Sequence, residues 1–193
     1  MSTGCGTWLL TGEAVKRYGL TPGTMLARDK LDALAEEVQL PAAKRDTGRY
    51  LERSEHSTSQ LRSYLLRRGY SPRVVESVSG WAEEVGYVDD ARFARAYVRS
   101  HRERSPMGVR RLRGELIRRG VPEPVADEVL GEMDDADLME VLVGKVRSSY
   151  GYLDPGKARN RALSYLKRRG FDYSLSSEVV SRALSPEDDG DRP

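Results

Sequence analysis

Apolar residues recur along this chain at the spacing of one face of a helix. Three pairs of apolar residues stand four positions apart, each pair separated from the next by about the same length of chain. Side chains three or four residues apart share one side of an α-helix. The pairs are Leu61 and Leu65, Leu112 and Leu116, and Ala162 and Leu166.

Each of these expected helices ends in two basic residues and a glycine. The glycines, Gly69, Gly120 and Gly170, lie 51 and 50 residues apart. Glycine adopts the left-handed conformation that ends many helices, and cations in the last turn meet the negative end of the helix dipole. Valine or leucine follows each glycine five and nine residues later, which predicts a second helix in each unit. The chain is therefore predicted to be all-α, with tandem three-helix repeats in an elongated array.

Polar residues mark the expected helix starts. Ser57-Thr58-Ser59-Gln60 has the form of a capping box. Ser71-Pro72, Ser105-Pro106 and Asp154-Pro155 each offer an N-cap and a proline in the first turn. The third helix of the first unit is expected to begin at Asp89-Asp90, and the matching helix of the second unit at Asp134-Asp135.

These signals divide the chain into five parts. An N-terminal extension and linker occupies residues 1–48, with Trp8-Leu9-Leu10 as the candidate for a short strand and residues 41–48 as the linker. The rest is predicted as a first three-helix repeat at 49–104, a second at 105–153, a third, truncated repeat at 154–184, and an acidic, disordered tail at 185–193.

Charge is unevenly distributed although the net charge is only +2. Residues 157–171 contain six basic residues and no acidic one, whereas the tail is acidic. Such blocks suggest a polyanionic partner or a protein with its own charge pattern. The single cysteine, Cys5, excludes a disulfide framework, and no apolar run approaches the ~20 residues of a membrane span. We therefore expect a cytoplasmic monomer.

Basic residues are the candidates for partner or DNA binding. Arg92, Arg95, Arg99 and Arg102 are spaced three, four and three apart, which predicts one stripe on a helix. A solvated charged face, or simple stabilisation of helix ends in the case of the Arg-Arg pairs, is the competing interpretation. The full set of candidates is Arg67, Arg68, Arg92, Arg95, Arg99, Arg102, Arg110, Arg111, Arg118, Arg119, Arg168 and Arg169.

Catalytic chemistry finds little support in the sequence. His56 and His101 have no cysteine nucleophile or metal-ligand spacing nearby, and the chain contains no Walker loop. The paired aspartates at helix starts are better explained as caps than as metal ligands. We therefore expect no enzyme activity, no metal and no cofactor.

Several stretches of the sequence resemble those of proteins of the RecX family. The stretches are Tyr50–Ser57, Gly86–Tyr97, Arg110–Leu112 and Arg119–Val121. The resemblance covers about residues 50–183 and implies tandem three-helix repeats. It also implies binding in the deep groove of the filament that the recombinase RecA forms on single-stranded DNA. Modulation of RecA ATP hydrolysis and strand exchange, usually inhibition, would follow, in homologous recombination, DNA repair and the SOS response.

Three functions remain open at this point. The first is a regulator that binds the RecA–DNA filament. The second is a protein that binds DNA directly through the arginine helix without sequence preference. The third is a nuclease that uses the paired aspartates, which no constellation of residues supports.

Overall fold

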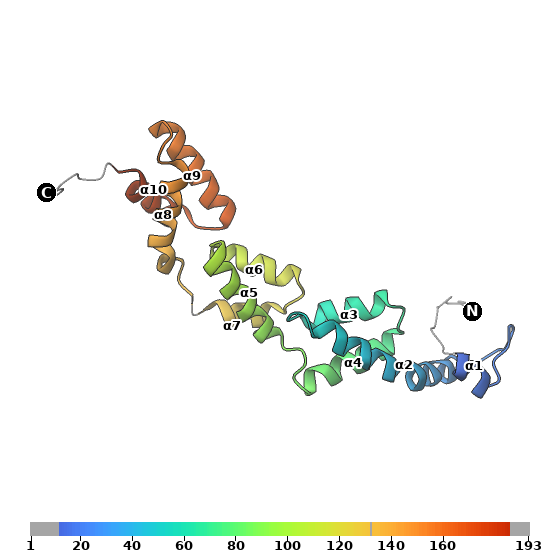
Figure 1. Ribbon diagram of the computed structural model, residues 1–193. Coiled ribbons are helices and arrows are strands. Elements are labelled where there is room, and N and C mark those ends of the chain that lie inside the picture. Colours follow the sequence, from blue (N-terminus) through green and yellow to red (C-terminus); the bar gives the residue numbers. More distant parts are fainter. Residues whose placement is uncertain (1–11, 132, 186–193) are drawn as a thin grey trace. The chain divides into compact units, whose positions relative to one another are not determined.

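The computed structural model describes residues 12–131 and 133–185, and its described elements are all helical (Figure 1). This confirms the all-α class, whereas the expected strand at residues 8–10 and the tail from residue 186 lie outside the described residues. None of the described helices combines the length and hydrophobicity that crossing a bilayer requires. The elements are α1 (Gly12–Arg17), α2 (Arg28–Leu51), α3 (Thr58–Arg67), α4 (Pro72–Glu84), α5 (Asp90–Arg104), α6 (Val109–Arg118), α7 (Glu123–Gly131), the 3-10 helix η1 (Asp135–Leu138), α8 (Met139–Tyr150), α9 (Pro155–Arg169) and α10 (Tyr173–Leu184).

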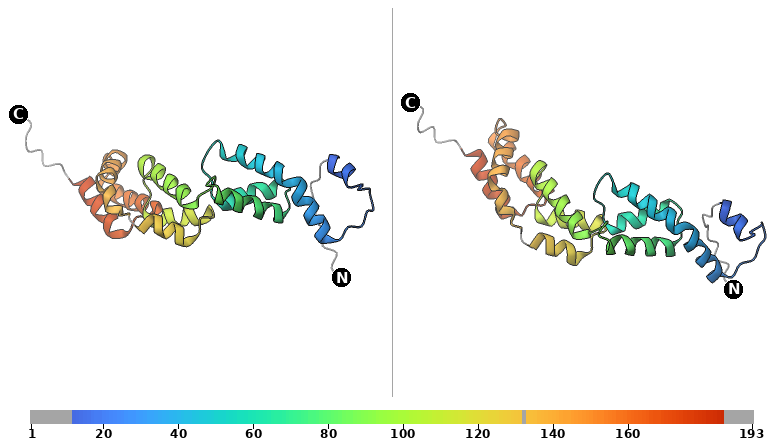
Figure 2. Two further views of the ribbon diagram at one scale, coloured as in Figure 1. Left: turned by 90° about the horizontal axis from the view of Figure 1, so that it is seen from below. Right: turned by 60° about the horizontal axis from the view of Figure 1, so that its bottom comes forward.

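The chain divides into two compact units. Unit 1 comprises Met1–Phe93 with Arg119–Val121, and unit 2 comprises Ala94–Arg118 with Pro122–Pro193. In unit 1, α2, α3 and α4 pack on one another. In unit 2, α6 packs on α7, and α8, α9 and α10 form a further group, which is coloured orange to red in Figure 2.

This packing groups the helices differently from the expected repeats at 49–104, 105–153 and 154–184. α8 packs on α9 and α10 rather than closing the preceding unit, so the last group has three helices instead of two. α2 likewise packs on α3 and α4, one helix earlier than expected. The periodicity of the sequence identifies the buried face of each helix but not the helix that it faces.

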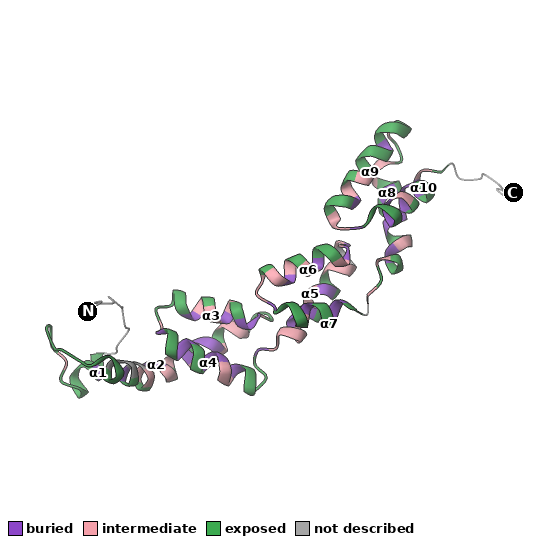
Figure 3. Ribbon diagram, turned by 180° about the vertical axis from the view of Figure 1, so that it is seen from behind, coloured by how far each residue is buried: buried purple, intermediate pink, exposed green. Residues whose placement is uncertain are grey.

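The apolar pairs form the cores of these groups. Leu61 and Leu65 of α3 are fully buried with Val74 and Val78 of α4 and with Ala43 of α2. The second cluster joins α8, α9 and α10 in the same way, and Figure 3 shows the buried residues in purple along the helices. Its fully buried members are Leu142, Val146, Ala162, Leu166, Val179 and Val180. Spacing of four residues therefore predicted the core of each group correctly.

The expected linker at residues 41–48 is wrong, because α2 runs through it from Arg28 to Leu51. Pro41 lies inside this helix, where it lacks the N–H that the helix normally uses. Burial of Ala43 and Thr47 against the core compensates for that loss. Asp46, on the same stretch, has a side chain that is only 5% exposed.

Most of the expected caps are present. Ser57 and Gln60 form the predicted capping box at the start of α3, and Ser71 accepts the backbone N–H of Val74 in α4. Asp154 caps α9 in the same manner. Ser105-Pro106 was a wrong prediction, because α6 begins only at Val109.

The first aspartate pair serves two helices. Asp89 accepts the backbone N–H of Arg92 in its own helix, at 2.9 Å. Asp90 instead accepts the backbone N–H of Thr58, the first residue of α3, at 2.9 Å. Burial raises the pKa of Asp90, and the N–H of Thr58 partly offsets that rise. Both aspartates were expected at the start of α5, whereas Asp90 completes a helix that begins 32 residues earlier.

The second aspartate pair repeats this division of roles. Asp134 accepts the backbone N–H of Ala136 at 2.9 Å, within its own short helix. Asp135 accepts the backbone N–H of Val109, the first residue of α6, at 3.0 Å. We call the contacts made by Asp90 and Asp135 cross-caps, because each carboxylate caps a helix distant in sequence.

A glycine accompanies each cross-cap. At the start of α3, the hydroxyl of Ser57 donates to the carbonyl oxygen of Arg119, which precedes Gly120. Near the start of α6, the N–H of Gly108 donates to the carbonyl oxygen of Arg169, which precedes Gly170, at 3.0 Å. Gly120 and Gly170 have φ angles of 82° and 91°. The glycine end of each of these two Arg-Arg-Gly motifs lies against the start of another helix.

Candidate binding surface

The predicted arginine stripe on α5 does not present four equivalent side chains. Arg92 donates to Glu55 at 2.9 Å and to the carbonyl oxygens of Gly86 and Tyr87 at 3.0 and 3.1 Å. It therefore ties the start of α5 to two neighbouring loops. An arginine that already donates hydrogen bonds to three acceptors is poorly suited to bind a partner.

Arg102, at the other end of the stripe, is also structural. Its side chain is 15% exposed, and it donates to the carbonyl oxygen of Asp134 at 2.8 Å. The carboxylates of Asp135 and Asp137 each lie 3.8 Å from its guanidinium. Arg95 and Arg99, between the two ends, are exposed and form no ion pair with a described residue. The stripe therefore contains two available cations rather than four.

Replacing Arg102 by alanine is expected to lower the free energy of unfolding by about 1–2 kcal/mol, since it removes a charge-assisted hydrogen bond and two ion pairs from a mostly buried site. Arg95→Ala, on the same helix, should change it by less than about 0.5 kcal/mol. Urea unfolding followed by circular dichroism measures both. Equal losses in the two variants would contradict this assignment of Arg102.

The three Arg-Arg pairs show a shared division. Arg67, Arg118 and Arg168, the first members, are exposed. The second members each make a contact within the chain. The side chain of Arg68 binds Asp46 at 2.9 Å, and the backbone carbonyl of Arg119 accepts from Ser57. Arg169 donates to Ser105, and its guanidinium lies 5.3 Å from the centre of the Tyr165 ring. Sequence position alone does not separate the two members of a pair, because both precede a helix-ending glycine.

Asp46 is the centre of the first of these contacts. Its carboxylate accepts hydrogen bonds from Arg49, Arg68 and the hydroxyl of Tyr70. Burial alone raises the pKa of Asp46, but these hydrogen bonds outweigh it and hold the pKa below its ordinary value. Burial and the bond to Asp46 raise the pKa of Tyr70 to about 12. Arg68 therefore contributes to the packing of α2 on α3 and α4.

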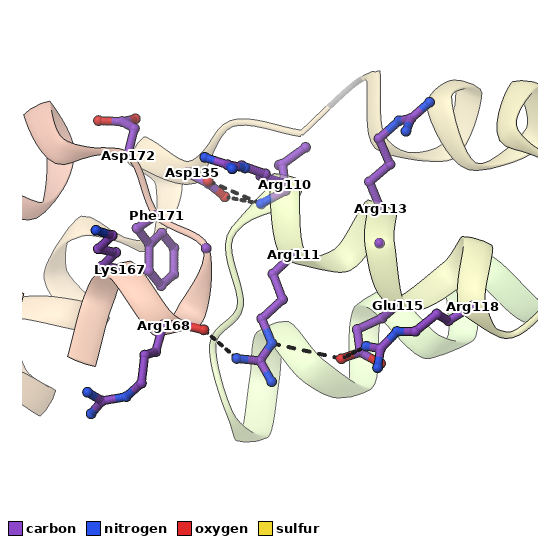
Figure 4. A pocket seen from close by; sticks show the side chains of 13 residues that line it. Arg110, Arg111, Arg113, Glu115, Arg118, Asp135, Lys167, Arg168, Phe171 and Asp172 are labelled. Carbon is purple, nitrogen blue, oxygen red and sulfur yellow. Dashed lines mark hydrogen bonds and ion pairs between the residues drawn. The ribbon is translucent and has the colours of Figure 1, made fainter. Parts of the chain in front are cut away.

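A groove of about 890 Å³ opens in unit 2 between α6 and the end of α9 (Figure 4). Arg111 crosses it, donating to the carbonyl oxygen of Arg168 and approaching Glu115 to 3.9 Å. Arg118 also pairs with Glu115. Arg113 pairs with Glu123 and Asp127. The other three cations of the groove form no ion pair through their side chains with a described residue: Arg110, Lys167 and Arg168.

The acidic residues of this groove are partly occupied. Asp135 makes the cross-cap to Val109. Burial raises the pKa of Asp135, and the N–H of Val109 and the charge of Arg102 only partly offset that rise. Glu115 is 15% exposed and is shared by two arginines. The groove therefore offers uncommitted positive charge at three side chains. Lys167 was not among the predicted site residues, although the acid-free run 157–171 contained the signal for it.

Both histidines have aromatic neighbours. His56 stacks on Tyr50 with ring centres 4.0 Å apart, and His101 stacks on Tyr97 at the same separation.

Within residues 12–131 and 133–185, no three histidine, cysteine, aspartate or glutamate side chains come together as they would around a metal ion.

Comparison with known proteins identifies these helices. Residues 44–78 match the model of the RecX first three-helix domain, and residues 89–130 match that of the RecX second three-helix domain. The regulatory protein RecX of Treponema pallidum (strain Nichols) is 38% identical over 146 residues, which is 74% of this chain and 83% of that protein. The regulatory protein RecX of Chlorobium limicola is 32% identical over 127 residues, covering 66% of this chain and 80% of the relative.

Solved structures show the same fold. A crystal structure of regulatory protein RecX has a TM-score of 0.67 at 21% identity and covers 88% of this chain and 85% of its own. The crystal structure of RecX from Lactobacillus salivarius has a TM-score of 0.67 at 16% identity, with coverage of 75% and 96%. The family resemblance of the sequence is thereby confirmed, and the chain belongs to the RecX family of regulatory proteins.

Proposed function

We propose that this chain binds the filament of RecA on single-stranded DNA and modulates, by inhibition, the ATP hydrolysis and strand exchange of RecA. The observation that carries the proposal is the set of exposed cations in unit 2 that have no carboxylate partner among the described residues, on a chain of a regulatory family. We assign the contact to Arg95 and Arg99 of α5 and to Arg110, Lys167 and Arg168 of the groove.

Uncommitted cations suit such a partner for a physical reason. A filament containing DNA is a polyanion, and each phosphate neutralised by a cation releases condensed counterions. An arginine that already holds a carboxylate must first give up that interaction. Arg95, Arg99 and Arg110 form no such pair with a described residue, so their binding carries no such cost.

The proposal also covers the cellular compartment, the oligomeric state and the absence of enzyme activity. Relatives of this chain are named regulatory proteins, and we propose that it acts in the cytoplasm as a monomer without enzyme activity. Sedimentation at several protein concentrations tests the monomer. Incubation of labelled DNA with the pure protein and magnesium tests the absence of nuclease activity.

Adding the protein to RecA on single-stranded DNA is expected to slow ATP hydrolysis. A variant with Arg95→Glu, Arg99→Glu and Arg110→Glu should need at least about tenfold more protein for the same inhibition, because three attractive charges become repulsive. Steady-state phosphate release measures both effects.

The control keeps the same change of net charge. Lys16, Arg28 and Arg53 are exposed cations of unit 1 without ion pairs to described residues, and replacing all three by glutamate should leave inhibition near the wild-type level. An unchanged RecA rate with the wild-type protein would overturn the proposed function. Equal losses in the two variants would place the contact elsewhere.

A further inference from the structure

The outer face of α9 carries a line of cations. Lys157, Arg161 and Arg168 are exposed, with the exposed Ser164 between the last two, and the spacing of four, three and four residues places them on one side. The line spans eleven residues, about 17 Å at the rise of an α-helix. The opposite side of α9 is buried through Ala158, Ala162 and Leu166.

No acidic side chain balances this line within the helix. From Pro155 to Phe171 the sequence contains none, and none of the three cations forms an ion pair with a described residue. On α6, by contrast, Arg113 binds Asp127 at 2.6 Å and Glu123 at 3.1 Å. Like charges four residues apart on a helix destabilise it slightly. The helix dipole accounts for Arg168 in the last turn, but it gives no reason for Lys157 and Arg161.

A hollow of about 460 Å³ lies along the same line. Tyr150, at the end of α8, lines it together with Asn160, Arg161, Ser164 and Arg168 of α9. It thus combines two guanidinium groups with an amide, a hydroxyl and a phenol ring. Such a lining suits an extended anionic chain with carboxylate or phosphate groups.

The end of α10 lies close to this hollow. Arg147 of α8 donates to the carbonyl oxygens of Arg182 and Ala183 in the last turn of α10, at 3.3 and 3.4 Å. Arg147 precedes Tyr150 by three residues, a spacing that places their Cβ atoms about 5–6 Å apart. The end of α10 is therefore held on α8 one turn before the residue that lines the hollow, and α10 also packs on α9.

The residues that follow carry the complementary charge. Glu187, Asp188, Asp189 and Asp191 come within seven residues of Leu184. From Ser185 to Asp191 an extended chain reaches about 20 Å. That is enough to bring these carboxylates from the end of α10 along the line of cations on α9.

We propose that the acidic run Glu187–Asp191 binds the basic face of α9 within the same molecule, and that the phosphates of a single-stranded nucleic acid compete with it for that face. The run then acts as a built-in competitor that weakens binding of polyanions at low salt. This regulation goes beyond the proposed action on RecA and does not require RecA.

Contact within the molecule is tested first. The tail-neutral variant carries Glu187→Gln, Asp188→Asn, Asp189→Asn and Asp191→Asn. Its backbone amide resonances between Lys157 and Arg168 should shift relative to wild type, while those of α3 stay in place. The shifts should disappear when both proteins are compared in about 0.5 M salt, where the Debye length is short. Identical α9 resonances at low salt would overturn the contact, and shifts that depend on protein concentration would show binding between molecules instead.

Competition is tested with a fluorescent oligo(dT) of about 15 nucleotides, within the site sizes typical of single-strand binding proteins. At low salt the tail-neutral variant should bind it about fivefold more tightly than wild type, the size expected from a few exposed ion pairs. The α9-neutral variant, with Lys157→Gln, Arg161→Gln and Arg168→Gln, should bind more weakly. Adding the tail substitutions to it should restore little, because the competitor has lost its site.

A charge-matched control separates the site from net charge. Glu52, Glu84, Glu128 and Glu178 are exposed and form no ion pair with a described residue. Replacing all four by glutamine removes as much negative charge as the tail-neutral variant and should change the affinity by less than twofold. An equal gain in control and tail-neutral variants, or an equal gain with and without the α9 cations, would overturn the proposal. No binding of oligo(dT) by any variant would overturn the competition.

Discussion

Replacing Gly170 by alanine is expected to lower the free energy of unfolding by about 3 kcal/mol. Its φ of 91° lies in the left-handed region, where a side chain costs about 1–2 kcal/mol. A Cβ at this position would also lie 2.5 Å from the Cβ of Arg111 and 2.9 Å from its backbone nitrogen. Since backbone cannot move aside as a flexible side chain does, the end of α9 would have to separate from α6, which adds the cost of overpacking.

Gly86→Ala provides the matched control for this prediction. Gly86 has a φ of 72°, but nothing lies within 4 Å of the position that its Cβ would occupy. Only the backbone strain of about 1–2 kcal/mol should therefore appear. Urea unfolding of both variants, followed by circular dichroism, measures the difference. Equal destabilisation would mean that the packing of Gly170 on Arg111 contributes nothing.

Asp46→Asn is expected to lower the free energy of unfolding by about 2 kcal/mol at neutral pH. The substitution keeps the size of the side chain but removes the charge that accepts from Arg49, Arg68 and Tyr70, and hydrogen bonds to a charged group contribute most when that group is buried. Both arginines are more than half exposed and return to water, which limits the loss.

The same variant should also change the dependence of stability on pH. The pKa of Asp46 is lower in the folded chain than in the unfolded one, so its stabilisation is present above about pH 4, the usual carboxyl pKa, and disappears as the pH falls through the lower folded value. The gap between wild type and Asp46→Asn should therefore close in acid. Glu52→Gln, at an exposed position at the end of the same helix, should show no such change. A gap that stays constant from pH 7 to strongly acidic pH would contradict the role of Asp46.

Local signals allowed much of this fold to be predicted. The pairs such as Leu61 and Leu65 identified the buried faces, and Ser57, Ser71 and Asp154 marked helix starts because an N-cap acts within its own first turn. Pro41 misled the prediction, since a proline usually ends a helix and its cost here is offset by burial that the local sequence does not reveal.

The candidate site was less predictable, and the reason is physical. Arg95 and Arg102 lie on one helix and carry the same charge, yet one is exposed and the other is held by the backbone of Asp134. Whether a cation is available depends on carboxylates and carbonyls brought in from distant positions. Helical spacing contains no information about them, whereas the acid-free run on α9 was visible in the sequence because it required no distant partner.

The cross-caps have a consequence for how the protein is made. In the first turn of α6, the N–H of Val109 donates to the carboxylate of Asp135. Just before this turn, the N–H of Gly108 donates to the carbonyl oxygen of Arg169. On the ribosome, α6 is therefore synthesised before the residues that accept hydrogen bonds at its first turn. The same holds for α3, whose start is bound by Asp90 and Arg119. The starts of α3 and α6 are thus each completed by a stretch of chain that is synthesised later.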